Sequence, residues 1–151
     1  MAQTDLETLV EYLRRRTART HVGLWLMPLN KIGHEAETAV HLGVQALNIG
    51  LYIHDKMPPG AEFVRLSAKK VVETLDEVAS SNGQSDCVLV YNFDLLISGV
   101  KDEERQQIWQ DLFNRFPGRA RVLLIAIPDT ATHLLPSESL LKKWKDDSRL
   151  V

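Results

Sequence analysis

Four short runs of mainly apolar residues are spaced along the chain. The runs cover residues 22–27, 51–54, 87–91 and 122–127. They do not alternate regularly with polar residues, which is the pattern of strands that are buried on both faces of a sheet. The pattern therefore predicts four main strands, with a further extended segment at 63–66.

Apolar residues at helical spacing occupy the segments before and between these runs. The predicted helices are residues 4–18, residues 36–47 stopped by Asn48 and Gly50, a segment capped by Ser67, residues 102–116, and a last helix that begins at Ser137. Each predicted strand is thus preceded by a helix. This alternation predicts right-handed crossovers and a three-layer α/β/α fold with a mostly parallel sheet.

A chain of 151 residues is long enough to bury the core of one domain. We expect a single domain over residues 1–151, with an N-terminal helix at 4–18 and an α/β core at 22–147. Neither an internal repeat nor an interdomain linker is visible in the sequence.

Charge and cysteine usage narrow the classes of function. A formal net charge of −2 argues against a protein that coats nucleic acid by bulk electrostatics. The single cysteine, Cys87, suits a reducing compartment, and its buried context does not predict a reactive thiol. With neither a membrane-length apolar run nor a secretory signal in the sequence, we expect a cytoplasmic protein.

The turn after the first predicted strand is the place where an α/β protein holds a phosphate. A P-loop needs the pattern G-x-x-x-x-G-K-[ST], in which amides, lysine and hydroxyl contact the phosphates and magnesium. Residues 28–35 keep this spacing, but only Gly33 matches. Pro28 replaces the first glycine, His34 the lysine and Glu35 the hydroxyl residue. A carboxylate at that position repels phosphate, although Lys31 brings one positive charge into the loop.

The third predicted strand ends where a nucleotide-binding protein carries an acidic Walker B pair. Asn92 stands at the position of the aspartate that faces magnesium, and Asp94 follows two residues later. An aspartate after a strand is also a common turn or helix-capping residue. The charged groups expected at both phosphate-binding motifs are therefore missing, which indicates a nucleotide site that has lost its function.

From residue 22 to residue 127 the chain resembles the AAA+/STAND branch of P-loop ATPases. The resemblance rests on the first strand with its loop, on the 88–94 strand end and on the 122–127 strand, which corresponds to the sensor strand of that family. It implies a sensor residue at Asp129 or Thr130. It also implies that Arg115 and Arg119 contact a neighbouring subunit.

Among small members, the size of the chain and the run Asn92-Phe93-Asp94-Leu95-Leu96 are similar to the BrxF-type P-loop proteins of BREX phage-defence systems. That family carries an intact P-loop, whereas this chain departs from it at three of the four motif positions. The resemblance implies a role in antiviral defence, and the departure argues against ATP hydrolysis.

Other polar residues suggest further chemistry. His54 and Asp55 resemble a base with its orienting carboxylate, but adjacent residues of a strand point to opposite faces. Glu37 and His41 lie four residues apart on a predicted helix and give only two ligands, so we expect no metal site. The segment Lys142-Lys143-Trp144-Lys145 is expected to be a solvated helix end.

These observations give one main hypothesis and two alternatives. The main hypothesis is a pseudo-ATPase without cofactor that binds other protein subunits, including copies of itself, without a membrane contact. Its degenerate phosphate loop is represented by Lys31, Gly33, His34 and Asp94. The first alternative is an atypical Mg-ATPase that uses Lys31 and Asp94. The second is a nucleic-acid-associated protein that uses an N-terminal arginine cluster, made of Arg14, Arg15, Arg16 and Arg19.

Overall fold

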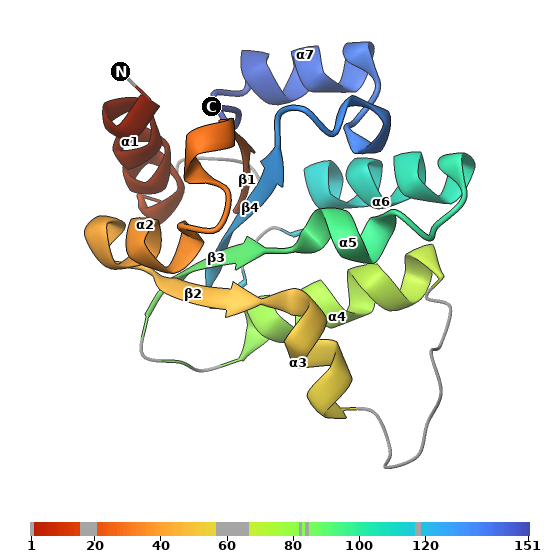
Figure 1. Ribbon diagram of the computed structural model, residues 1–151, viewed down its shortest axis with the longest axis horizontal. Helices are drawn as coiled ribbons and strands as arrows, with labels where there is room; N and C mark the ends of the chain where they lie inside the picture. The colour runs from red at the N-terminus through yellow and green to blue at the C-terminus, as the bar shows by residue number, and fades with distance from the viewer. Residues whose placement is uncertain (1, 16–20, 57–66, 82, 84, 117–118) are drawn as a thin grey trace.

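A four-stranded, all-parallel sheet forms the centre of the protein. The computed structural model describes residues 2–15, 21–56, 67–81, 83, 85–116 and 119–151 (Figure 1). The strands are β1 (Val22–Met27), β2 (Gln45–Asn48), β3 (Cys87–Tyr91) and β4 (Val122–Pro128). They lie in the order β1-β4-β3-β2, so β4 separates β1 from β3. The predicted α/β fold with a parallel sheet is confirmed.

Helices cover both faces of this sheet. The helices are α1 (Ala2–Arg14), α2 (Glu35–Leu42), α3 (Ile49–Lys56), α4 (Ala68–Ser80), α5 (Phe93–Ile97), α6 (Asp102–Asn114) and α7 (Glu138–Asp146), with 3₁₀ turns η1 (Leu29–Lys31) and η2 (Thr132–Leu134). Helices α1 and α2 lie on one face, and α4, α5 and α6 lie on the other (Figure 1). The sheet and the helices on its two faces therefore form three layers.

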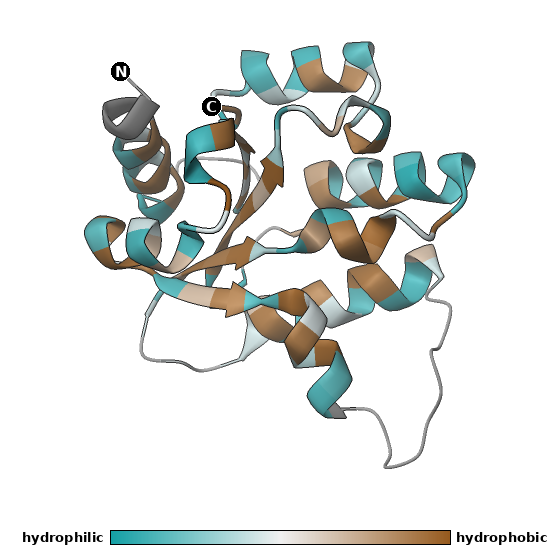
Figure 2. Cartoon of the chain, viewed as in Figure 1, coloured by the Kyte–Doolittle hydropathy of each residue, from teal (hydrophilic) through white to brown (hydrophobic). Residues whose placement is uncertain are grey.

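Two hydrophobic clusters fill the space between the layers, and alternate residues of each central strand feed them. In β4, Leu123 and Ile125 point into the cluster under α4 and α6, whereas Leu124 and Ala126 point into the cluster under α1 and α2. Figure 2 shows the central strands as mainly apolar, with polar residues on the outer sides of the helices. A strand buried on both faces produces the continuous apolar run that the sequence displays.

The sequence prediction was wrong between residues 36 and 54. Helix α2 ends at Leu42 because Gly43 adopts a left-handed conformation (φ 69°), and the next strand is β2. Residues 51–54 belong to α3 rather than to a strand. The amide of Leu51 donates to Oδ1 of Asn48 at 3.3 Å, which helps to start this helix directly after β2.

Other expected boundaries are closer to the structure. Ser67 and Ser137 cap α4 and α7, because each hydroxyl accepts a hydrogen bond from the amide three residues later. Helix α1 ends at Arg14 and α6 at Asn114, each earlier than expected. Residues 16–18 of the predicted first helix and the extended segment at 63–66 lie outside the described residues.

The outer edge of β1 is covered by residues 149–151. The amide of Leu24 donates to the carbonyl of Arg149 at 2.8 Å, and the amide of Val151 donates to the carbonyl of Leu24 at 3.0 Å. Leu150 forms a parallel bridge with Leu24. This segment therefore extends the sheet beyond β1 and satisfies backbone groups that an edge strand leaves unpaired.

Arg149 holds this segment in place through a buried guanidinium group. Its side chain is 1% exposed, and its Nε donates to the carbonyl of Val22 at 2.8 Å. The same group donates to the carbonyl of Phe113 at the end of α6 and pairs with Asp147 at 3.0 Å. Burial lowers the pKa of Arg149, and the hydrogen bond to Asp147 opposes that effect.

We expect Arg149→Ala to lower the free energy of unfolding by about 2–4 kcal/mol, because it leaves several buried carbonyls without a donor. Urea denaturation monitored by circular dichroism measures this change. The matched control is Arg15→Ala, since Arg15 is 72% exposed and forms a surface ion pair with Glu11 at 3.4 Å. A loss for Arg149→Ala as small as that of the control contradicts the role of Arg149 as a clamp.

Candidate functional site

The loops that follow β1, β4 and β3 meet at one edge of the sheet. All strands are parallel, so their carboxyl ends lie on the same side. The amide of Asp129, after β4, donates to the carbonyl of Met27 at the end of β1 at 2.9 Å. Neighbouring strands are about 4.8 Å apart, so residues 92–94 after β3 lie two strand spacings from the β1 loop. The phosphate-loop, sensor and Walker B positions of the sequence analysis thus come from adjacent strands.

In the loop after β1, four consecutive backbone amides donate hydrogen bonds to oxygen atoms of neighbouring residues in the chain. The amide of Lys31 donates to the carbonyl of Pro28 at 2.9 Å, that of Ile32 to Leu29 at 3.3 Å, and that of His34 to Lys31 at 2.9 Å. These bonds form the 3₁₀ turn η1 and the turn after it. A P-loop needs such amides to be free for phosphate, whereas here they close the loop on itself.

The fourth amide, that of Gly33, donates to Oε1 of Glu35 at 2.8 Å. Gly33 has a left-handed backbone (φ 87°), which favours glycine. Glu35 is the first residue of α2, and it is only 7% exposed. The sequence analysis treated Glu35 as a group that repels phosphate. In the structure its carboxylate also accepts a hydrogen bond from the backbone of the loop.

The residues of this loop do not fit a nucleoside triphosphate bound in the P-loop manner. Amides 31–34 are already paired, and the position of the usual lysine is held by His34. The carboxylate of Glu35 already accepts the Gly33 amide, which is a bond that a phosphate oxygen would otherwise accept.

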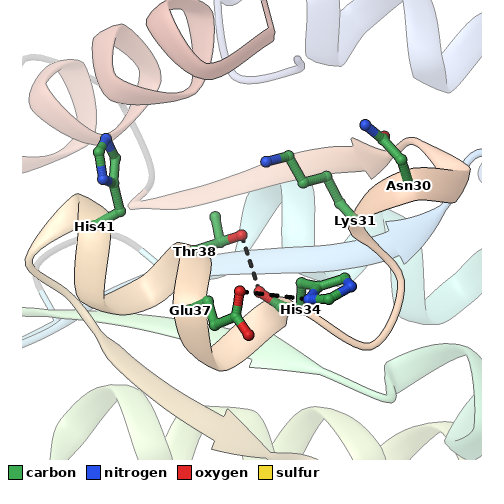
Figure 3. Close-up of a pocket in the computed structure, with 6 residues that line it drawn as sticks. All are labelled: Asn30, Lys31, His34, Glu37, Thr38 and His41. Carbon is green, nitrogen blue, oxygen red and sulfur yellow. Dashed lines mark hydrogen bonds and ion pairs between the residues drawn. The ribbon is translucent and has the colours of Figure 1, made fainter.

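A polar hollow of about 340 Å³ lies between this loop and α2 (Figure 3). Six side chains line it: Asn30, Lys31, His34, Glu37, Thr38 and His41. Nδ1 of His34 lies 3.4 Å from Oε2 of Glu37, and the hydroxyl of Thr38 donates to the carbonyl of His34 at 3.0 Å. Figure 3 shows His41 farther along α2, with its ring turned away from that pair.

The hollow brings together only part of the predicted site. Lys31 and His34 line it, and Gly33 lies in the loop between them, whereas Asp94 is not among its lining residues. Glu37 and His41 do share a helical face, as expected. Among the described residues, no group of three or more His, Cys, Asp or Glu side chains is arranged to hold a metal ion.

Asp94 lies at the start of a short helix. Asn92 adopts a left-handed backbone (φ 61°) and ends β3, and α5 begins at the next residue. This puts Asp94 in the first turn of α5, where a carboxylate stabilises the positive end of the helix. The carbonyl of Asp94 accepts the amide of Ser98 at 3.0 Å. Asp94 is thus a residue of the first helical turn, whereas the cap position is held by Asn92.

The segment after β4 is fixed to α6 by hydrogen bonds from three side chains of that helix. Arg105 donates to the carbonyl of His133 at 3.1 Å, Trp109 to that of Leu134 at 2.8 Å, and Gln106 to that of Leu135 at 3.2 Å. Arg105 is buried although arginine is usually exposed, so composition alone gave no signal for it. Asp129 and Thr130 are exposed at the beginning of the segment.

The described candidate partner-binding arginines are Arg14, Arg15, Arg115 and Arg119, and they lie near the amino ends of the strands. Arg14 ends α1 and Arg15 follows it, whereas Arg115 and Arg119 follow α6; the two helices lead into the amino ends of β1 and β4. The ion pairs are Arg14 with Asp86 (3.0 Å), Arg15 with Glu11 (3.4 Å), Arg115 with Asp111 (3.3 Å) and Arg119 with Asp76 (2.5 Å). Arg16 and Arg19 lie outside the described residues. Each of these four described arginines thus has a carboxylate partner, and none of them lines the hollow beside the loop.

The pair formed by His54 and Asp55 lies on α3 rather than at a strand end. Nδ1 of His54 is 3.8 Å from Oδ1 of Asp55, and both side chains are largely exposed. A general base works best when a cavity desolvates it and its substrate. Since neither residue lines the hollow beside the loop, this pair gives no support for a catalytic base.

Comparisons of the chain with protein-family models, with curated proteins and with solved structures found no match. Within the part of the chain that the structure describes, no helix combines the length and the apolar character that a membrane span requires. The function is therefore inferred from the geometry of the site.

Cys87 is the first residue of β3 and is completely buried. Burial raises the pKa of its thiol to about 12; the charge of Arg14 lowers this pKa and the charge of Asp86 raises it, each by less than burial does. The thiolate is the reactive form of cysteine. A buried thiol that stays protonated is thus a core residue, as the sequence analysis expected.

We expect native Cys87 to resist a thiol reagent at pH 8 and to react once the protein is unfolded in urea. Because the pKa of the thiol is higher in the folded state, ionisation of the unfolded thiol favours unfolding as the pH rises from about 9 toward 12. Cys87→Ala removes this contribution, so the stability of the variant should fall less steeply over that range. Equal slopes for the two proteins contradict the raised pKa.

Proposed function

We propose that this chain is a non-catalytic, AAA+/P-loop-like subunit that works through protein–protein contacts in a larger cytoplasmic assembly, with BREX-type phage defence as the biological setting. The observation that carries the proposal is the closed loop after β1. Its amides 31–34 all donate to acceptors of the chain itself. A loop that satisfies its own donors keeps its shape without a nucleotide.

The arrangement of the sheet supports the resemblance on which the proposal depends. The strand that carries the loop (β1), the strand assigned as the sensor strand (β4) and the strand that precedes Asn92 (β3) are neighbours, in that order. Their carboxyl ends form one edge, which is where α/β proteins bind ligands. The scaffold of a nucleotide site is compatible with this layout, while the groups that bind phosphate are replaced.

Exposed apolar side chains at this edge support a role in protein contacts. Leu29 is 73% exposed and Ile32 is 39% exposed, and both lie in the loop itself. Leu51 and Leu95, in the helices that directly follow β2 and β3, are 59% and 68% exposed. Large apolar groups that face solvent favour contact with another protein surface over contact with a charged phosphate chain.

The two alternatives have weaker support. An ATPase that uses Lys31 and Asp94 needs both side chains to reach the same nucleotide. Of the two, Lys31 lines the hollow beside the loop and Asp94 does not. A nucleic-acid-binding surface needs cations that are free to meet phosphates. The described arginines of the N-terminal cluster, Arg14 and Arg15, are each paired with a carboxylate.

We expect Mg-ATP to leave the melting temperature of the protein unchanged. A ligand that binds the native state at about 100 times its dissociation constant adds about 2.7 kcal/mol of stability, which thermal melting detects readily. Mg-ADP and magnesium alone are measured in parallel, so that an effect of the ion is separated from that of the nucleotide.

Lys31→Ala and Lys101→Ala serve as the paired variants for this test. Lys31 lies in the loop and lines the hollow, whereas Lys101 is an exposed lysine that precedes α6. An upward shift with Mg-ATP that disappears in Lys31→Ala and persists in Lys101→Ala would overturn the proposed function and favour the atypical ATPase.

A further inference from the structure

The carboxylate of Glu35 lies in an unusual environment for a charged group. It is 7% exposed, and its Oε1 accepts the amide of Gly33 at 2.8 Å. Among the described residues, no lysine, arginine or histidine forms an ion pair with it within 4.0 Å. A buried charge is costly unless donors or dipoles compensate for it. Here the compensation comes from the Gly33 amide and from the positive end of α2, which begins at Glu35.

The neighbouring carboxylate, Glu37, shows that this arrangement is specific to Glu35. Both residues lie in the first turn of α2, so both interact favourably with the helix end. The side chain of Glu37, however, is 80% exposed and pairs with His34 on the side of the hollow. Glu35 instead folds back over the turn at Gly33. Of the two carboxylates, that of Glu35 therefore bonds to the loop and that of Glu37 faces the hollow.

We propose that Glu35 is a built-in anion that keeps the loop closed and blocks it against external phosphate. Its carboxylate provides the negative charge that meets the loop amide and the helix end. The conformation of the loop then depends on the chain itself and not on the concentration of a ligand. This inference rests on the proposed function, in which the loop holds no nucleotide, and it adds how that state is maintained.

The proposal is tested first on the unchanged protein by amide hydrogen exchange. The Gly33 amide is expected to exchange at least about 10-fold more slowly than the Gly99 amide, because a hydrogen bond to a charged acceptor protects it. Both glycines are exposed, and the amide of Gly99 has no acceptor in the described part of the chain. Equal exchange rates for the two glycines would overturn the proposal.

The second test removes the carboxylate and supplies a substitute. Glu35→Ala should lower the melting temperature by roughly 4–10 °C, and sodium formate should restore part of that loss relative to sodium chloride at matched ionic strength. Glu37→Ala is the control, since it removes a carboxylate from the same helix turn. Formate should not change the melting temperature of Glu37→Ala or of the unchanged protein beyond the effect of chloride.

Glu35→Gln keeps the test decisive if the alanine variant does not fold. Its side-chain carbonyl still accepts the Gly33 amide but carries no charge, so Gly33 should be protected less than in the unchanged protein and more than Gly99. Full protection of Gly33 in this variant, or equal effects of formate on both alanine variants, would overturn the proposal. The response of the unchanged protein to Mg-ATP tests the proposed function separately.

Discussion

The pairing of β1 with β4 is the contact on which the rest of the architecture depends. It joins residues about one hundred positions apart, from Val22 with Leu123 to Met27 with Pro128. Because β4 also pairs with β3, it connects β1 to the remainder of the sheet. The loop after β1 lies beside the loop after β4 only as a result of this pairing. The clamp at Arg149 then covers the other edge of β1, so this strand has neighbours on both sides.

At the candidate site, the requirement to satisfy turn-forming amides explains how the loop after β1 keeps its shape without a bound phosphate. Each backbone N–H needs an acceptor, and a P-loop normally finds one in the phosphate. In this chain the carbonyls of Pro28, Leu29 and Lys31 take that role for three amides, and the carboxylate of Glu35 takes it for the fourth. The backbone needs are met locally, and the apolar side chains of Leu29 and Ile32 remain at the surface.

The sequence predicted the strands β1, β3 and β4 well and the edge strand β2 poorly, for physical reasons. Strands β1, β3 and β4 are buried on both faces, so burial alone explains their apolar runs. Strand β2 is a short edge strand that starts with the exposed Gln45, so it lacks such a run. The apolar segment at 51–54 belongs to α3, which begins directly after β2. Sequence periodicity over four residues does not separate a helix from a strand. At the site, the sequence located the altered loop, but it could not show that Glu35 folds back onto Gly33. It also gave no signal for the buried Arg105 and Arg149, because long cationic side chains are usually exposed.

The anchoring of residues 133–135 to α6 has a consequence for the way a partner would bind. Three successive carbonyls are held by side chains of one helix, so moving this segment breaks three hydrogen bonds at once. At about 1 kcal/mol for each bond, the displaced form is rare at equilibrium. A partner that docks beside this segment would meet a preformed surface and lose little conformational entropy on binding. Its association would then be limited by diffusion and orientation instead of by a rearrangement of this chain, so mutations in the contact would act mainly on the dissociation rate.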